Sequence, residues 1–325
     1  MGENAKKTGD KLEQFGGNYL MTKLGWQELL RDYEIKCSRS SHKNSKDGNK
    51  LTHGIDLLCK FDDPYSRTGQ AVVIECKNWQ MQSINATSVG EWVMELINNI
   101  DCAQSAPELQ NVGVDTSVLA TGLLLIHAND RYDEKKMETI LQGISAPNRR
   151  MPINVFIATN REIYMWTSLF NEIDRTFKDS DFDFVYPSIN ESSKVISKHI
   201  PINALFSRFL FAQHTYAIDF NDGNRKGTEQ KSESVLFSFD DISLDSFRYI
   251  WSMFKYYQME GTNSYIFYFY PRKSEDVQLI TAENFINAIA QDDADISDIT
   301  KSKIQVKILD NRELSPVDTK KGETL

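Results

Sequence analysis

The sequence predicts an α/β protein with two domains, and three observations support this fold class. Segments with the apolar patterns of strands alternate along the chain with segments of helical periodicity, as in a sheet flanked by helices. The chain has 325 residues, 40% hydrophobic and 26% charged, which is typical of folded proteins with about 150 residues per domain. An acidic, serine-rich segment at 174–198 interrupts the pattern and indicates a boundary between two halves.

The first half is expected to contain a helix, three strands, a helix, a strand, a helix and a final strand. Asp10 is a suitable N-cap for a first helix that ends at about Leu24, and a helical turn or two is expected at 26–31. The second and third strands form a hairpin, so the sheet is mixed. Strands are expected at 33–37, 53–61, 71–77, 118–127 and 153–159, and the later helices at 89–100 and 133–143.

The second half is expected to form a smaller α/β (α+β) domain. Aromatic residues in its longest predicted helix lie along one stripe, which is typical of a core-facing helix and, less often, of an interaction surface. Helices are expected at 202–212, 243–258 and 281–290, strands at 214–220, 234–239, 264–270 and 303–309, and a loop at 221–232. The predicted domain limits are 1–180 and 195–312, followed by a flexible tail at 313–325.

Composition and charge exclude several classes of protein. The longest apolar runs, such as 123–126, are far shorter than the roughly 20 residues that span a bilayer, and the N-terminus is polar, so we expect a cytoplasmic protein without membrane contact. The net charge of −9 argues against unselective coating of nucleic acid but not against a local basic groove. Isolated cysteines predict neither a zinc knuckle nor a disulfide framework; they are Cys37, Cys59, Cys76 and Cys102.

Two acidic side chains and a lysine are expected to meet on the predicted hairpin. Alternate residues of a strand share a face, so Glu75 and Lys77 point to the same side, and the short spacing from Asp56 places the two carboxylates side by side. Adjacent like charges are costly unless a cation lies between them. Two carboxylates and the carbonyl of Cys76 are ligands that suit Mg²⁺. Lys77 could then orient a water and stabilise charge on a phosphate, which is the chemistry of phosphodiester cleavage.

The surroundings of this Glu-x-Lys tripeptide distinguish it from three others. The tripeptide occurs four times and is uninformative by itself, but only Glu75 follows a Gly-Ile-Asp strand and ends an apolar run. The copy at Glu134 is on a predicted helix, the copy at Glu229 in a polar loop, and the copy at Glu34 has no acidic strand before it. The alternative is a surface salt-bridge cluster at a sheet edge.

The residues Gly54-Ile55-Asp56 and the strand that ends in Glu75-Cys76-Lys77 resemble the PD-(D/E)XK, or restriction-endonuclease-like, nuclease superfamily. The similarity in element order covers roughly residues 10–167. It implies a restriction-endonuclease-like mixed sheet flanked by helices, with Asp56 and Glu75 as metal ligands and Lys77 as catalytic lysine. Many members add an acid on the first helix; Glu13 lies about one turn before that place. The superfamily includes enzymes of restriction, repair, recombination and defence against phage.

Several residues near these strands are candidates for binding nucleic acid. Basic side chains are in excess just before the Asp56 strand, at Lys43, Lys46 and Lys50, which could grip phosphate or form a solvated loop. Asn78 and Trp79 directly follow Lys77, and the aromatic ring could stack on a base or pack in the core.

The leading hypothesis is a Mg²⁺- or Mn²⁺-dependent endonuclease that cuts DNA, with a role in bacterial defence against phage or plasmid DNA. The long second domain suggests a further protein subunit or a homo-oligomer that selects the target. The alternative is a degenerate subunit that binds nucleic acid or acts as a scaffold without cutting. A metal-free enzyme with a cysteine nucleophile is less favoured, because no histidine partner is evident from the sequence.

Overall fold

The chain divides into two compact units, one ending at Ile163 and the other beginning at Tyr164. Each unit contains one mixed sheet with helices, which confirms the α/β fold class. The domain limits expected from the sequence stay a prediction, and the tail at 313–325 lies outside the described residues. The computed structural model describes residues 21–43, 48–66, 69–145, 152–177, 181–186, 195–221, 226–293 and 296–311.

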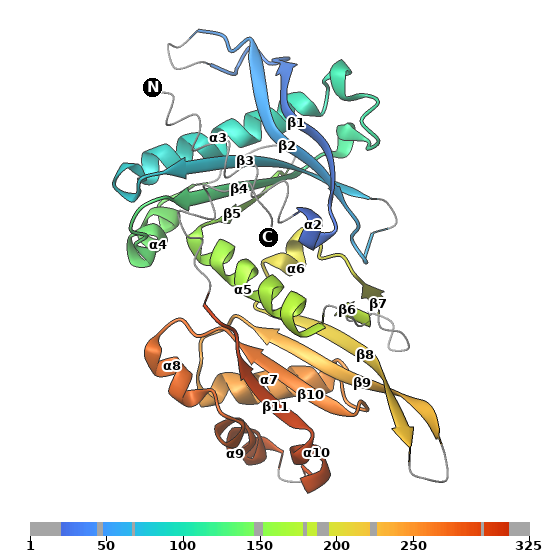
Figure 1. The fold of residues 1–325 in the computed structure, drawn as a ribbon. Helices are drawn as coiled ribbons and strands as arrows, with labels where there is room; N and C mark the ends of the chain where they lie inside the picture. Colours follow the sequence, from blue (N-terminus) through green and yellow to red (C-terminus); the bar gives the residue numbers. More distant parts are fainter. Residues whose placement is uncertain are drawn as a thin grey trace. The chain divides into compact units, whose positions relative to one another are not determined.

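The first unit is built on a five-stranded sheet in the order β1-β2-β3-β4-β5 (Figure 1). β2 is antiparallel to both of its neighbours, β1 and β3, whereas β3, β4 and β5 run parallel to one another. The central strands are buried, so their sequences are nearly continuous in apolar residues. The strands are β1 (Gln27–Lys36), β2 (Thr52–Phe61), β3 (Gln70–Trp79), β4 (Thr121–Ala128) and β5 (Asn154–Ala158).

Helix α3 (Ala86–Ala103) connects β3 to β4 and covers one face of this sheet, where it contacts β2, β3 and β4 (Figure 1). It begins at Asn85, whose side chain accepts a hydrogen bond from the backbone of Ser88 in a capping box. Gly122 of β4 allows the close approach, because a Cβ there would lie 2.9 Å from side-chain atoms of Leu96 and Ile100. The other helices in the described part of this unit are α2 (Met21–Leu24), α4 (Glu134–Gln142), and the short 3₁₀ helices η2 (Met81–Ser83), η3 (Pro107–Leu109) and η4 (Thr116–Val118).

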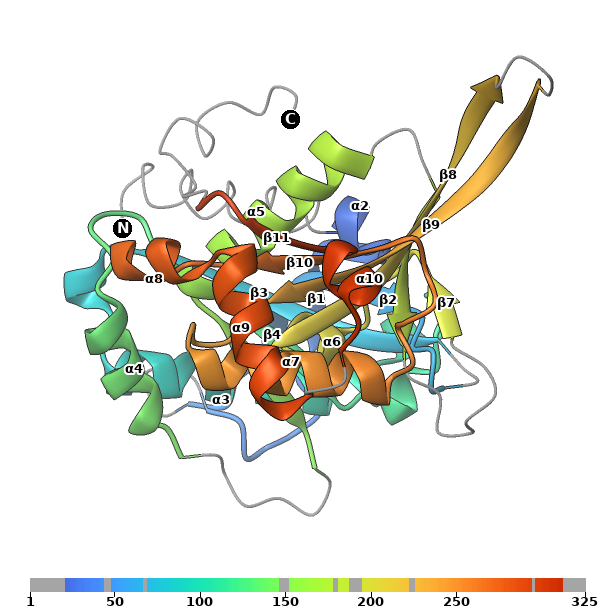
Figure 2. The same cartoon turned by 90° about the horizontal axis from the view of Figure 1, so that it is seen from below.

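The second unit has a six-stranded sheet in the order β11-β10-β9-β8-β6-β7 (Figures 1 and 2). An aromatic core joins one face to α7 (Leu244–Tyr256) and α9 (Ala282–Asp292), where Phe247 and Phe285 are fully buried. The strands are β6 (Asp181–Tyr186), β7 (Val195–Ser197), β8 (Phe209–Asn221), β9 (Lys226–Ser238), β10 (Ser264–Phe269) and β11 (Ile304–Ile308). The other helices are α5 (Asn160–Phe177), which crosses the division between the units, α6 (Ile202–Leu205), α8 (Ser274–Leu279) and α10 (Asp298–Ser302).

Three local expectations from the sequence were wrong. Residues 27–31 have helical propensity but form part of β1, because pairing with β2 outweighs local preference. Residues 226–232 were expected to be a loop but form β9, whose outer half is polar because it is largely exposed to solvent. The expected helix at 202–212 ends at Leu205. The segment at 174–198 contains β6 and β7, and the boundary expected there stays a prediction.

Among the described residues, no helix is both long and apolar enough to cross a membrane.

Candidate active site

Asp56 and Glu75 lie side by side on neighbouring strands. The register of β2 and β3 pairs Leu57 with Ile74, so the next position along the ladder places Asp56 opposite Glu75. Asp56 Oδ2 accepts a hydrogen bond of 2.7 Å from the backbone N–H of Cys76. This bond fixes the Asp56 carboxylate against β3, next to the Glu75 side chain. The first geometric expectation from the sequence, two adjacent carboxylates on the hairpin, therefore agrees with the structure.

Lys77 joins the same cluster through its ammonium group. Its Nζ donates to Oε1 of Glu75 at 2.9 Å and lies 3.6 Å from Oε2 of Glu95 on α3. The Lys77 side chain is 17% exposed and that of Glu75 6% exposed, so this ion pair is largely shielded from water. Asp56, Glu75 and Lys77 thus form one cluster beneath α3.

Two residues of α3, Glu95 and Asn99, complete the cluster and were missed in the sequence. Asn99 donates from Nδ2 to Oε2 of Glu75 at 3.1 Å and to the carbonyl oxygen of Gly54 at 2.8 Å. Glu95 bonds Lys50 at 3.3 Å in addition to its contact with Lys77. The two residues are four positions apart and therefore share a helix face. A polar pair at this spacing beside the apolar stripe of α3 is the signal that could have revealed them.

Burial is the largest cause of the raised pKa of both carboxylates. Burial, and secondly the charge of Asp56, raise the pKa of Glu75 to about 7. Burial also raises the pKa of Asp56, although the Cys76 hydrogen bond and Lys77 act in the opposite direction. Burial alone would lower the pKa of Lys77, but the charge and hydrogen bond of Glu75 outweigh it, so the pKa is raised. The cluster therefore carries closely spaced negative charge that Lys77 alone does not neutralise.

This arrangement fits a hard divalent cation. Asp56 and Glu75 offer carboxylate oxygens next to each other in a largely buried setting, and such oxygens are the preferred ligands of Mg²⁺ and Mn²⁺. A cation between them would remove the repulsion that raises the pKa of Glu75.

Asp32 of β1 adds a fourth carboxylate, after Asp56, Glu75 and Glu95. The register pairs Arg31 with Leu57 and Tyr33 with Ile55, which places Asp32 next to Asp56, and its charge contributes to the raised pKa of Asp56. Asp32 has a φ of 47°, in the left-handed region that a residue other than glycine rarely adopts. Such strained residues cluster at functional sites.

The other Glu-x-Lys tripeptides lie in different surroundings. Glu229 and Lys231 are on β9, where their side chains bond each other at 2.5 Å in an exposed position. Glu134 is the first residue of α4 and is paired with Arg161. Glu34 is exposed on β1. Among the four tripeptides, Glu75-Cys76-Lys77 alone combines a buried acid with a neighbouring acidic strand.

The residues expected to contact nucleic acid do not all lie next to the cluster of Asp56, Glu75 and Lys77. Lys50 bonds Glu95 and so adjoins the cluster, whereas Lys43 bonds Asn49 within its own loop. Asn78 contacts His127 through a bond of 3.2 Å. Trp79 is 41% exposed, and its ring lies 5.7 Å from that of Trp92. Lys46 and Glu13 lie outside the described residues.

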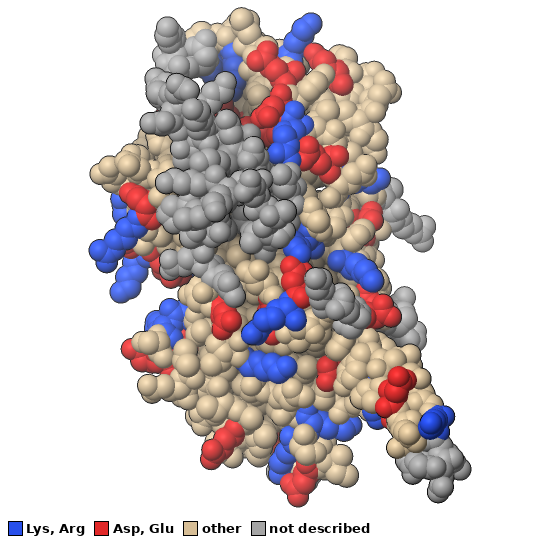
Figure 3. Space-filling view, in the orientation of Figure 1, with Lys and Arg blue, Asp and Glu red and all other residues tan. Residues whose placement is uncertain are grey.

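Acidic and basic side chains are interspersed on the face that Figure 3 draws. Charge on this face therefore does not by itself mark a nucleic-acid surface, and the site is identified by the side-chain cluster under α3.

Comparison with known proteins supports the resemblance to the superfamily. A search of curated proteins gives no match to the chain. The family described as the GAPS4 protein PD-(D/E)XK nuclease domain matches residues 1–162, which include β1 to β5 and the whole Asp56, Glu75 and Lys77 cluster. GAPS4 is a family of phage-defence proteins. Residues 1–162 are therefore a PD-(D/E)XK nuclease domain of the GAPS4 family.

Proposed function

We propose that this protein is a metal-dependent endonuclease that hydrolyses DNA and acts against phage or plasmid DNA in a bacterial cytoplasm. The observation that supports it most directly is the contact of three side chains: Asp56 beside Glu75, and Lys77 bonded to Glu75 at 2.9 Å. A nuclease-family domain acts on nucleic acid. We propose in addition that the substrate is DNA, that a divalent metal ion is bound, and that these three residues are catalytic.

Asp56, Glu75 and the carbonyl of Cys76 would hold Mg²⁺ or Mn²⁺. When bound, such an ion polarises a phosphoryl oxygen and makes a coordinated water more acidic. Lys77 carries a positive charge beside this position, so it would orient the attacking water and stabilise negative charge that develops on the phosphate. Glu13, which lies outside the described residues, remains a proposed additional ligand.

Glu95 and Asn99 would position the catalytic groups without touching substrate. Asn99 fixes one oxygen of Glu75, and Glu95 draws the Lys77 ammonium toward α3. Such supporting contacts restrict the rotamers of the groups that act on substrate.

Lys43, Lys46 and Lys50 would contact the DNA backbone, and Asn78 and Trp79 would contact a base. The exposed ring of Trp79, two residues after Lys77, suits stacking. A second protein subunit, or another copy of this chain, would direct the nuclease to its target.

The test is a cleavage assay with plasmid, linear duplex, single-stranded DNA and RNA. Each substrate is incubated with Mg²⁺, Mn²⁺ or a chelator. Asp56→Asn, Glu75→Gln and Lys77→Met should each lower DNA cleavage by at least about 1,000-fold while the protein remains folded. Glu229→Gln and Lys231→Met change the matched tripeptide on β9 and should leave cleavage unchanged.

Equal cleavage by the wild type and the Glu75→Gln variant would refute these catalytic assignments. Binding of DNA without cleavage under either ion would refute the enzyme and agree with the alternative, a non-cutting scaffold subunit. Preference for RNA would keep the chemistry and correct the substrate.

A further inference from the structure

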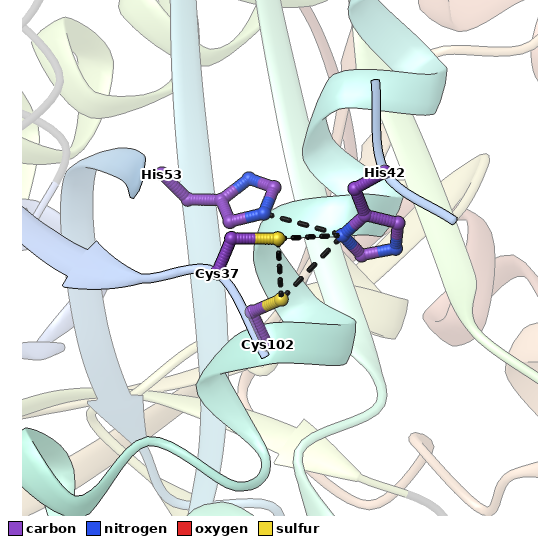
Figure 4. Close-up of side chains that lie close together, drawn as sticks. All are labelled: Cys37, His42, His53 and Cys102. Carbon is purple, nitrogen blue, oxygen red and sulfur yellow. Dashed lines mark hydrogen bonds between the residues drawn. The ribbon is translucent and has the colours of Figure 1, made fainter. Parts of the chain in front are cut away.

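Four metal-binding side chains meet next to the candidate active site but do not belong to it. They are Cys37 at the end of β1, His42 in the following loop, His53 of β2 and Cys102 of α3 (Figure 4). One nitrogen or sulfur atom of each lies within 4.8 Å of the others. His42, His53 and Cys102 are buried, and Cys37 is half-buried. Residues far apart in sequence thus direct two sulfurs and two nitrogens at one point.

Four of the six distances between these atoms match the edges of a zinc tetrahedron, and the other two, from His53 to the sulfurs, are within 4.8 Å. Zn–S bonds of about 2.3 Å and Zn–N bonds of about 2.05 Å give edges of about 3.8 Å for S–S, 3.6 Å for S–N and 3.3 Å for N–N. The two sulfurs of Cys37 and Cys102 are 3.9 Å apart. Nδ1 of His42 lies 3.6 Å and 3.5 Å from these two sulfurs and 3.2 Å from Nε2 of His53. All four values are within about 0.2 Å of the tetrahedral ones.

The neighbouring hydrogen bonds leave the ring nitrogen of His53 available as a ligand. Asn99 directs its amide nitrogen at two acceptors, Gly54 and Glu75, so its oxygen faces Nδ1 of His53 at 2.9 Å. That contact requires the ring proton on Nδ1. The neutral ring then presents a lone pair on Nε2, toward the centre of the cluster.

His42 faces the same point with its own lone pair. Oδ2 of Asp101 lies 3.8 Å from Nε2 of His42 and favours the proton on that nitrogen. Nδ1 of His42 then has a lone pair directed at the lone pair of His53 only 3.2 Å away. Two such lone pairs repel each other, and Nδ1 cannot accept a hydrogen bond from both thiols at once. A cation at the centre satisfies the two nitrogens and the two sulfurs together.

Polar groups around the sulfurs also fit thiolate ligands. The backbone N–H of Ser38 lies 3.4 Å from Sγ of Cys102, and the Ser38 hydroxyl lies 3.6 Å from the same atom. Donors directed at a sulfur stabilise its negative charge, which a metal-bound thiolate carries.

We propose that Cys37, His42, His53 and Cys102 bind one structural Zn²⁺ ion. Two thiolates and two imidazoles form a soft donor set that selects zinc over Mg²⁺. Four protein ligands leave no open position, so the ion acts as a structural link and not as a catalyst. It fastens the loop between β1 and β2 to α3, the helix that carries Glu95 and Asn99.

The full chain, purified under reducing conditions, should contain one zinc per molecule by mass spectrometry of metals. Cys102→Ser should lose most of it, whereas Cys59→Ala, at a buried cysteine outside the cluster, should retain it. Glu75→Gln should also retain it, which separates this ion from the one proposed at the active site. Metal-free wild type titrated with Co²⁺ should develop the absorption of a tetrahedral thiolate complex at one equivalent. This result does not depend on whether any variant folds.

Three results would overturn the proposal. One is wild-type protein that contains no zinc and gives no tetrahedral Co²⁺ spectrum. Another is a Cys37 to Cys102 disulfide in the reduced preparation, shown by intact mass and by resistance of both thiols to alkylation. Zinc content that is equal in the wild type and the Cys102→Ser variant would place the metal elsewhere, and would equally contradict this assignment.

Discussion

Asn99 donates a hydrogen bond to Glu75 and, through the oxygen of the same amide, accepts one from His53. One side chain of α3 therefore contacts both the candidate active site and the proposed zinc site. Because its nitrogen faces Glu75 and Gly54, its oxygen faces His53, so a single amide contacts both clusters. The two clusters should respond together to substitution at this position.

Asn99→Ala should lower stability, cleavage and zinc retention together. The substitution removes the hydrogen-bond donor to Glu75 and to the carbonyl oxygen of Gly54. A buried polar group left without its partner lowers the free energy of unfolding by about 1–3 kcal/mol. Loss of the bond to His53 should weaken zinc binding by about 10- to 100-fold. Urea unfolding, a cleavage assay and a competition with a zinc chelator measure the three effects. Asn98→Ala, one position earlier on α3, is the control and should retain zinc and activity.

Glu95→Gln should slow cleavage by about 10-fold without abolishing it. The substitution removes one of the two carboxylates that contact Lys77, so the ammonium is less well fixed, while its bond to Glu75 is kept. Because Glu95 is proposed to position Lys77 without touching substrate, kcat should fall more than KM rises. Glu91→Gln changes an exposed acid of the same helix and should have no effect. A loss as large as that of Glu75→Gln would show that Glu95 acts on substrate or metal directly.

Gly122→Ala should destabilise the first unit, and Gly90→Ala should not. A Cβ at Gly122 would lie 2.9 Å from Leu96 and Ile100 and would force α3 from the sheet, at a cost of about 1–3 kcal/mol. Gly90 lies within α3 with nothing within 4 Å of such a Cβ, so alanine there should raise the unfolding free energy by up to about 1 kcal/mol. Thermal and urea unfolding compare the two variants. Equal stability of both would contradict the close packing of α3.

The sequence was sufficient to predict the hairpin residues but not their partners on α3. Asp56, Glu75 and Lys77 could be predicted because the period of a strand and a short spacing place them together. Glu95 and Asn99 could not, because their roles depend on which helix face lies against β3. The four cysteine and histidine side chains were also missed as a group, since their spacing has no short motif and only the packing of α3 against β1 and β2 brings them together.

In the second unit, local sequence patterns did not predict strands whose side chains are largely exposed to solvent. The outer residues of β9 are polar on both faces, so neither alternation nor apolar content distinguishes them from a loop. β6 and β7 form part of a sheet within a segment whose acidic and serine-rich composition resembled a linker. Strand pairing over long sequence distances decided these elements, and a window of local sequence does not contain that information.

His127 should make the first unit less stable as the pH falls from 6.5 to 4. Burial lowers the pKa of His127 to about 4, and its Nε2 is buried without a hydrogen-bond partner among the described residues. Above pH 6.5 the ring is neutral in both states and contributes nothing. Between 6.5 and 4 the unfolded chain binds a proton that the folded chain does not, so stability decreases by about 2–3 kcal/mol.

Substitution of His127 measures how much this residue contributes to the pH dependence of the unfolding free energy. His127→Leu removes the titrating group, so its unfolding free energy in urea should decrease less than that of the wild type over this pH range. The carboxyl groups titrate in both proteins, and their contribution therefore cancels in the comparison. Parallel pH profiles for the two proteins would mean that folding does not perturb the His127 ring, and that water reaches Nε2 in the folded state.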